Sequence, residues 1–116
     1  MKSFTDLEQS KKLAEILPLE SADFMWEYEP DKETYWDKPT VIPIDSYIFI
    51  NDIPCWSLAA LLEYMNRNFY NISLNYCGSE YTISFDDGER YKTITKDYSI
   101  DTAFEMIVWL KETNRI

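Results

Sequence analysis

The chain of 116 residues contains no histidine, and this absence excludes several kinds of chemistry. Histidine is the usual general base of enzymes, the partner of nucleophilic serine and cysteine, and the commonest metal ligand in proteins. An enzyme built from this sequence would depend on carboxylates, lysine, tyrosine or a lone cysteine. We therefore expect no enzyme activity, no catalytic residues, no metal ligands and no cofactor.

Glycine and long apolar runs are also scarce. The only glycines, Gly78 and Gly88, form neither a GxxxxGK[ST] nor a GxGxxG loop, which argues against nucleotide binding. The stretch DDGE at 86–89 lacks the twelve-residue ligand spacing of a calcium loop and predicts a tight turn. Apolar stretches such as 58–62 are far shorter than the ~20 residues of a membrane span, and no signal-peptide core follows Met1. We expect a cytoplasmic protein that does not contact membranes.

The sequence has two cysteines, Cys55 and Cys77, which are 22 positions apart and not in a CxxC pair. In a cytoplasmic protein this pattern predicts two reduced, partly buried thiols. A disulfide or a reactive thiolate is the alternative.

Charge is mostly of one sign. The chain has 21 acidic and 11 basic side chains and a net charge of −10. In the segment ESADFMWEYEPDKETYWDKP (20–39), seven carboxylates accompany one lysine between positions 20 and 37, so this stretch holds six of the ten net negative charges. Such a field repels nucleic acid and anionic membranes and attracts basic partners, although it can also serve solubility alone.

Hydrophobic periodicity predicts three helices. The first covers about 4–17, begins with a capping box of Thr5 and Glu8, and ends before Pro18. The second covers about 54–68, with the apolar stripe Leu58, Leu61, Leu62, Met65 and Phe69. The third covers about 99–114, with Ser99 as its cap, Asp101 in its first turn and the buried stripe Ile100, Ala103, Phe104 and Ile107.

Period-two patterns between the helices predict strands. Phe24, Trp26 and Tyr28 alternate with other side chains, and the turn EPDK leads to a return strand at TYW, which indicates a β-hairpin. Residues 40–52 predict one or two more strands, broken or at an edge near Pro43. Three strands follow between 70 and 95, with Ile72, Leu74, Tyr76, Tyr81, Ile83 and Phe85 facing inward.

Strands grouped in hairpins predict one α+β domain, residues 1–116, with an antiparallel sheet packed by about three helices. The expected order is one helix, two or three strands, a second helix, three strands and a third helix.

Three stretches are similar to a known family: FTDLEQSKKLAEILPLESAD (4–23), CWSLAALL (55–62) and SIDTAFEMI (99–107). They resemble a family of small uncharacterised proteins from gut anaerobes and their mobile elements, and together they cover about a third of the chain. Residues 24–54 depart from that pattern. A variable middle on a constant frame is where the resemblance would put a partner-specific surface. The family has no established activity, so the resemblance implies no catalytic residue.

The candidate partner-binding residues lie in the acidic segment and on the last helix: Trp26, Glu27, Tyr28, Glu29, Glu33, Tyr35, Trp36 and Trp109. The aromatic face of the first strand belongs by default to the core, and its carboxylates then point to solvent. Tyr35 and Trp36 are adjacent, so one of them should be accessible. Trp109 lies on the polar side of its helix beside Glu105 and Glu112, where it is either a contact residue or covered by a neighbouring segment.

These features favour a small acidic, non-enzymatic protein-interaction or regulatory module. Its partner would be a basic protein rather than nucleic acid or a membrane, and it could act as an inhibitor of the immunity or DNA-mimic type. Self-association through Trp109 stays open. The alternative is a carbohydrate or small-ligand binding domain with a pocket lined by Trp26, Tyr28, Tyr35 or Trp36. Lys92 and Lys96, near Arg90, form a small basic spot that we interpret as protection of an edge strand.

Overall fold

The computed structural model describes residues 3–42, 52–69 and 71–116. Its helices are α1 (Leu7–Ala14), α2 (Leu58–Asn68) and α3 (Ser99–Glu112), with a short 3-10 helix, η1, at Leu19–Ser21. Its strands are β1 (Phe24–Trp26), β2 (Tyr28–Glu29), β3 (Thr34–Tyr35), β4 (Thr40–Val41), β5 (Ile53–Cys55), β6 (Ile72–Cys77), β7 (Glu80–Asp86) and β8 (Tyr91–Lys96).

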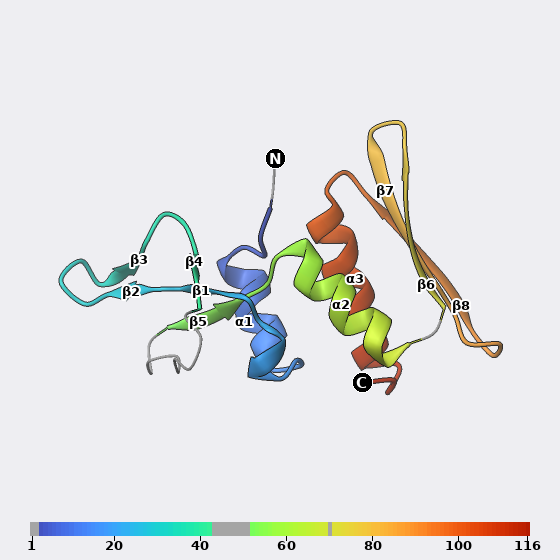
Figure 1. Ribbon diagram of the computed structural model, residues 1–116, viewed down its shortest axis with the longest axis horizontal. Helices are drawn as coiled ribbons and strands as arrows, with labels where there is room; N and C mark the ends of the chain where they lie inside the picture. Colours follow the sequence, from blue (N-terminus) through green and yellow to red (C-terminus); the bar gives the residue numbers. More distant parts are fainter. Residues whose placement is uncertain (1–2, 43–51, 70) are drawn as a thin grey trace.

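The strands form three antiparallel groups. One sheet has the order β4-β1-β5, β2 and β3 form a separate hairpin, and the second sheet has the order β6-β7-β8. The first sheet and the hairpin lie at one end of the chain's long axis and the second sheet at the other, with the helices between them (Figure 1). The α+β class and the predicted order of elements are confirmed.

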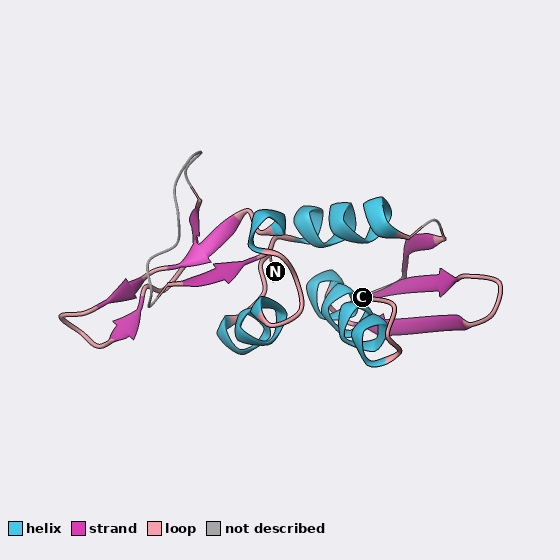
Figure 2. Cartoon of the chain, turned by 90° about the horizontal axis from the view of Figure 1, so that it is seen from below, coloured by secondary structure: helices cyan, strands magenta, loops and turns pink. Residues whose placement is uncertain are grey.

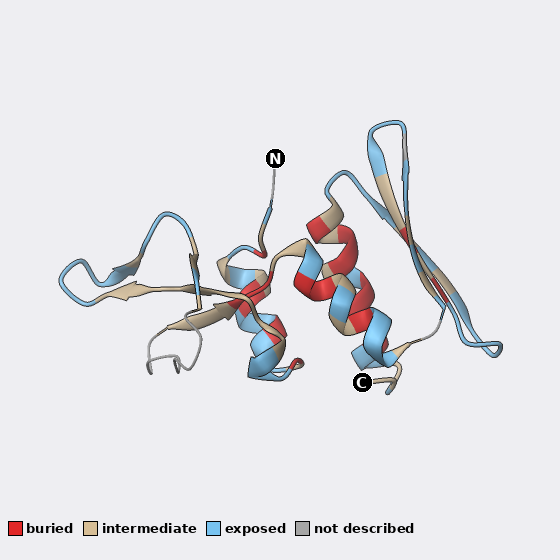
Figure 3. Ribbon diagram, in the orientation of Figure 1, coloured by how far each residue is buried: buried red, intermediate tan, exposed pale blue. Residues whose placement is uncertain are grey.

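The hydrophobic core lies where the three helices meet β7. Leu13 of α1, Leu61 of α2, Ile107 and Leu110 of α3, and Ile83 of β7 are fully buried. The buried positions are concentrated on the facing sides of the helices (Figure 3). Each such side chain contributes roughly 1.5–3 kcal/mol by leaving water, which makes this cluster the main source of stability.

Among the described residues, helices cover one face of the second sheet. α3 packs against β7 and β8, and α2 packs against α3, so that both helices lie on the same side of the sheet (Figure 2). Ile83 and Phe85 face the helices as expected. Tyr76, also predicted to face inward, is 64% exposed, and its ring lies 4.8 Å from that of Tyr81. The prediction for Tyr76 is therefore wrong.

The helix ends differ from those predicted. Asp6, not Thr5, caps α1: its carboxylate accepts from the Gln9 N–H at 2.8 Å, and its own N–H donates to Gln9 Oε1 at 3.1 Å. α2 begins only at Leu58, because Ile53–Cys55 pair with β1 as strand β5 and Ser57 caps the helix. Tyr98 occupies the N-cap position of α3, and Ser99 is its first helical residue.

The tight turn between β7 and β8 is confirmed. Gly88 has φ +86°, a conformation that L side chains rarely adopt. The Asp86 and Asp87 carboxylates accept backbone N–H groups within the turn at 2.7–2.9 Å. Of the strands predicted in 40–52, β4 is observed, whereas Pro43 lies outside the described residues.

Thr5 links the first sheet to the helices. The side chain is fully buried, and its hydroxyl accepts from the Trp56 N–H at 3.2 Å and lies 2.7 Å from Ser10 Oγ. Its backbone N–H donates to the Trp56 carbonyl at 3.0 Å. The sulfur of Cys55 donates to the Thr5 carbonyl at 3.4 Å. These bonds join the residues before α1 to the segment between β5 and α2.

Candidate functional site

The acidic segment 20–37 runs from η1 through β1 and into the β2–β3 hairpin, which extends away from the helices (Figure 1). Tyr28 pairs with Tyr35 and Glu29 with Thr34. The Lys32 N–H donates to the Glu29 carbonyl at 3.2 Å, which puts Pro30 in the second place of the turn. The predicted hairpin is thus confirmed.

Trp26 faces the body of the protein and not a partner. Its indole N–H donates to the Thr5 carbonyl at 3.3 Å and to Ser10 Oγ at 3.2 Å. Phe24, on the same strand, packs edge-on against Phe4 with ring centroids 4.5 Å apart. Both side chains are half-buried. Their contacts are those of side chains that fix β1 to the start of α1.

Tyr28 and Tyr35 hold the hairpin together. Their rings meet edge to face across the two strands, with centroids 5.3 Å apart, an arrangement that adds about 0.5–1.5 kcal/mol to area burial. The Tyr28 N–H also donates to Asp52 Oδ1 at 2.9 Å. Both side chains are half-buried, so they stabilise the hairpin and offer only part of their surface to a partner.

Trp36 is the accessible aromatic residue of the segment, with 52% of its surface exposed. Its backbone N–H donates to the Glu27 carbonyl at 3.0 Å, which fixes the chain just beyond β3. One member of the pair Tyr35 and Trp36 was expected to be accessible, and the structure identifies it as Trp36.

Five of the seven carboxylates of the segment lie between positions 27 and 37, and these fall into two groups. Glu27 accepts from Thr40 Oγ1 at 2.8 Å, and Glu29 lies 3.5 Å from the Lys32 ammonium, so both already have partners. Asp31, Glu33 and Asp37 are exposed, and no side chain among the described residues pairs with theirs. We name Trp36 with these three acids the hairpin surface.

Asp31 and Asp37 were not among the predicted site residues. Asp31 lies within the predicted turn EPDK, and Asp37 follows the adjacent pair Tyr35 and Trp36. These positions are the signal that could have found them. Glu33, which was predicted, has φ +52° and turns the chain into β3. This conformation points to a role in shaping the hairpin as well as in carrying charge.

Trp109 lies far from the hairpin surface. Its half-buried ring is 5.6 Å from that of Phe85 and 5.4 Å from the Arg115 guanidinium. Arg115 binds Asp87 Oδ2 through Nε at 2.9 Å and Nη2 at 2.8 Å. Trp109 is thus partly covered by the sheet and the C-terminal residues.

The Asp87 carboxylate itself is held by several donors. Hydrogen bonds from the backbone N–H groups of Arg90 and Glu89 and from the Arg115 side chain lower the pKa of Asp87 to about 2.

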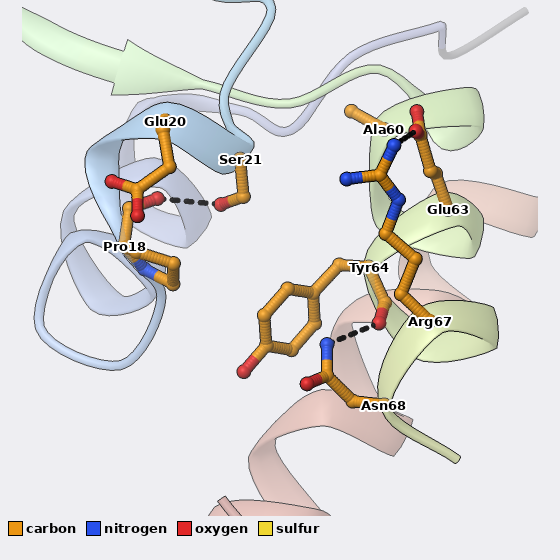
Figure 4. A pocket seen from close by; sticks show the side chains of 8 residues that line it. All are labelled: Pro18, Glu20, Ser21, Ala60, Glu63, Tyr64, Arg67 and Asn68. Atoms are coloured by element: carbon orange, nitrogen blue, oxygen red, sulfur yellow. Dashed lines mark hydrogen bonds and ion pairs between the residues drawn. The ribbon is translucent and has the colours of Figure 1, made fainter.

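A pocket of about 290 Å³ opens between η1 and α2 (Figure 4). The Tyr64 ring lies between its two walls, and burial raises the pKa of the Tyr64 hydroxyl. Arg67 is paired with Glu63 at 2.7 Å, and Asn68 Nδ2 donates to the Tyr64 carbonyl at 2.7 Å. Glu63, Arg67 and the Asn68 amide thus already have partners within the protein. Its lining is Pro18, Glu20, Ser21, Ala60, Glu63, Tyr64, Arg67 and Asn68.

The aromatic residues proposed for a sugar pocket lie elsewhere. Trp26, Tyr28, Tyr35 and Trp36 line neither this pocket nor those beside the β7–β8 turn and along β8. None of these three pockets therefore supports the carbohydrate alternative.

The Cys55 thiol is shielded from solvent. Cys55 is fully buried and forms no disulfide, and burial raises the pKa of its thiol above the usual range. The prediction for Cys77 concerns a side chain outside those described.

Among residues 3–42, 52–69 and 71–116, no group of three acidic or cysteine side chains could hold a metal ion. In the same part of the chain, no helix has the length and apolar character needed to cross a membrane.

Comparison of the chain with protein-family models, with curated proteins and with solved structures found no match. Function is therefore inferred from the geometry and chemistry of the hairpin surface.

Proposed function

We propose that this protein is a non-enzymatic interaction module that binds a basic protein through the hairpin surface. The observation that carries the proposal is the 52% exposure of Trp36 on the same hairpin as three exposed carboxylates that have no partner among the described side chains. Tryptophan is enriched among the residues that dominate binding energy at protein interfaces. Unpaired carboxylates around it would steer a positively charged partner and raise the association rate.

The support of the hairpin favours a preformed binding surface. Tyr28 packs on Tyr35, and the Trp36 and Lys32 N–H groups are bonded to carbonyls of β2 and its neighbours. Little conformational entropy is lost when a partner binds a surface that is already ordered, and this favours affinity. Inhibition of a basic enzyme, such as one that binds nucleic acid, is the biological role we propose for such a surface.

The test is a pull-down from lysate of the source organism with three forms of the protein. The first is the wild type, and the second is the charge reversal D31K/E33K/D37K. The third is a matched reversal, E15K/E80K/E89K, which changes the net charge equally at exposed positions outside the hairpin. A basic protein retained by the wild type and the matched control, but not by the hairpin variant, is the expected result.

Salt provides a second criterion. Raising the ionic strength from 0.1 M to 1 M shortens the screening length from about 10 Å to about 3 Å, so steering by exposed carboxylates should fail. Substitution of Trp36 by alanine should weaken binding of the captured protein about 30-fold, the effect of losing one hot-spot side chain. Equal retention by all three forms, or binding that neither salt nor W36A changes, would refute the proposal.

A further inference from the structure

The longest uncharged stretch of the chain forms one edge of the second sheet. Residues 68–79 have no acidic or basic side chain, although 28% of the chain is charged. Strand β6 lies within this stretch and pairs with β7 on one side and with no other described strand. Natural proteins usually protect such an edge from other strands with charged side chains, proline or a bulge. β6 has no proline, and its pairing with β7 runs without a bulge, so this edge lacks all three.

The backbone groups along this edge are open to pairing. The Asp86 N–H donates to the Asn71 carbonyl at 3.3 Å, so these two residues form a bonded pair between β7 and the start of β6. Bonded residues alternate along an antiparallel pair. The residue after Asn71, and every second one beyond it, therefore turns its N–H and C=O groups away from β7. These residues are Ile72, Leu74 and Tyr76.

The side chains of the same three residues are incompletely covered. Ile72 and Leu74 face the helices and are half-buried. Tyr76 is on the same face, as its sequence pattern predicts, yet 64% of its surface is exposed. A further strand beside β6 would cover the accessible sides of all three residues.

β6 is complementary to itself in one antiparallel register. With Leu74 opposite Leu74 of a second copy, all three residues with free backbone groups lie opposite one another. Ile72 then faces Tyr76 of the second copy, and the reverse pair repeats it; pairs of an aromatic and a β-branched side chain stabilise sheets. Ser73 faces Asn75 on the other side of the sheet. Shifting the second copy by two residues in either direction leaves one of the three residues without a partner in β6.

Charge favours a second copy at this edge more than elsewhere on the protein. Residues 71–96, which form the second sheet, have four acidic and three basic side chains, so they hold only one of the ten net negative charges. The acidic segment 20–37 holds six and lies at the other end of the long axis (Figure 1). No like charges are opposed in the register centred on Leu74. The other edge of the sheet, β8, carries Lys92 and Lys96.

We propose that the protein forms a two-fold dimer in which β6 pairs antiparallel with β6 of a second copy, centred on Leu74. The pairing joins two three-stranded sheets into one of six strands. Six residues from each strand are fewer than the roughly 20–30 that each partner contributes to a standard interface. The dissociation constant is therefore expected in the micromolar range. This interface is independent of the hairpin surface.

The test is sedimentation equilibrium between about 10 µM and about 1 mM protein, with two variants at exposed positions of β6. S73K/N75K places lysines directly opposite one another in the proposed register and should weaken the dimer at least about tenfold. S73K/N75E places each lysine opposite a glutamate of the other copy and should dimerise at least as tightly as the wild type. In the two shifted registers S73K/N75E would oppose like charges, so this variant also tests the alignment. Circular dichroism checks that both variants fold.

A mixing experiment and hydrogen exchange complete the test. S73K/N75K and S73E/N75E should each be monomeric alone and should associate when mixed in equal amounts. In the wild type, the amides of Ile72, Leu74 and Tyr76 should exchange slowly only at high concentration, whereas those of Ser73 and Asn75, which bond to β7, are protected at any concentration. A wild type that stays monomeric at about 1 mM, leaving the edge to a strand of another protein, overturns the proposal. So does a dimer that S73K/N75K does not weaken, or one that S73K/N75E loses equally.

Discussion

The buried hydroxyl of Thr5 offers the sharpest test of how the first sheet is held to the helices. Thr5→Val keeps the shape of the side chain and removes only the hydroxyl. The Trp56 N–H then loses its acceptor, 3.2 Å away, and Ser10 Oγ loses its partner at 2.7 Å. An unsatisfied buried N–H costs about 1–3 kcal/mol, and a lost hydrogen bond costs about 0.5–1.5 kcal/mol. We expect the free energy of unfolding to fall by about 2–4 kcal/mol in total.

The measurement is urea unfolding followed by tryptophan fluorescence, with thermal unfolding as a check. Each kcal/mol should lower Tm by about 4 °C in a chain of this size. Two controls separate the hydroxyl from packing. Thr5→Ser keeps the hydroxyl and should cost only about 1 kcal/mol for the lost methyl group. Ser10→Ala leaves the Trp26 indole N–H bonded to the Thr5 carbonyl, so it should cost about 0.5–1.5 kcal/mol. If Thr5→Val is no less stable than Thr5→Ser, the hydroxyl does not hold this junction.

Three further predictions concern a buried thiol, a hydrogen-bonded carboxylate and a turn glycine. Burial raises the pKa of Cys55, so its thiol should resist iodoacetamide at pH 8 until the protein unfolds. Above about pH 9 the thiol at position 55 ionises in the unfolded chain but not in the folded protein, so the free energy of unfolding should fall there. The fall should be smaller in C55A, and urea midpoints measured across this pH range would show the difference. The pKa of Asp87 is lowered to about 2 from 3.8, so this carboxylate stabilises the fold above pH 3.8 and less as the pH falls toward 2. Substitution of Asp87 by asparagine, or of Arg115 by glutamine, should flatten the acid limb of the stability curve, and an unchanged limb would contradict this. Gly88→Ala should cost about 1–2 kcal/mol in urea unfolding, since φ is +86°, and a neutral effect would show that the turn adapts.

Local patterns predicted most of the secondary structure. The spacing of Leu58, Leu61 and Met65 predicted the buried side of α2, and the dipeptide Asp87-Gly88 predicted the last hairpin. These signals depend on residues within one or two turns of each other. For the same reason the sequence placed the start of α2 too early. Ile53–Cys55 form a strand only because Phe24, about thirty positions earlier, pairs with Cys55.

The candidate site was predicted in part. Composition located the acidic segment and the alternation predicted the hairpin, but neither could distinguish Trp26 from Trp36. That difference depends on the bonds of the Trp26 indole N–H to Thr5 and Ser10, 21 and 16 positions earlier in the chain. Trp109 was placed on a polar side of α3, where a single helix viewed alone would expose it. Strand β7 and Arg115 supply the cover, and both are contacts that helical periodicity does not contain.

The separation of the hairpin from the hydrophobic core has a consequence for how this protein can evolve. Residues 30–37 include none of the fully buried core side chains, which lie between the helices and β7. If the proposed function holds, substitutions at Asp31, Trp36 or Asp37 should change recognition at little cost in stability, because surface changes away from buried contacts usually alter it by less than about 0.5 kcal/mol. A lineage could exchange one target for another at this tip while the helices stay constant. The same property makes the hairpin a suitable place to graft foreign binding loops.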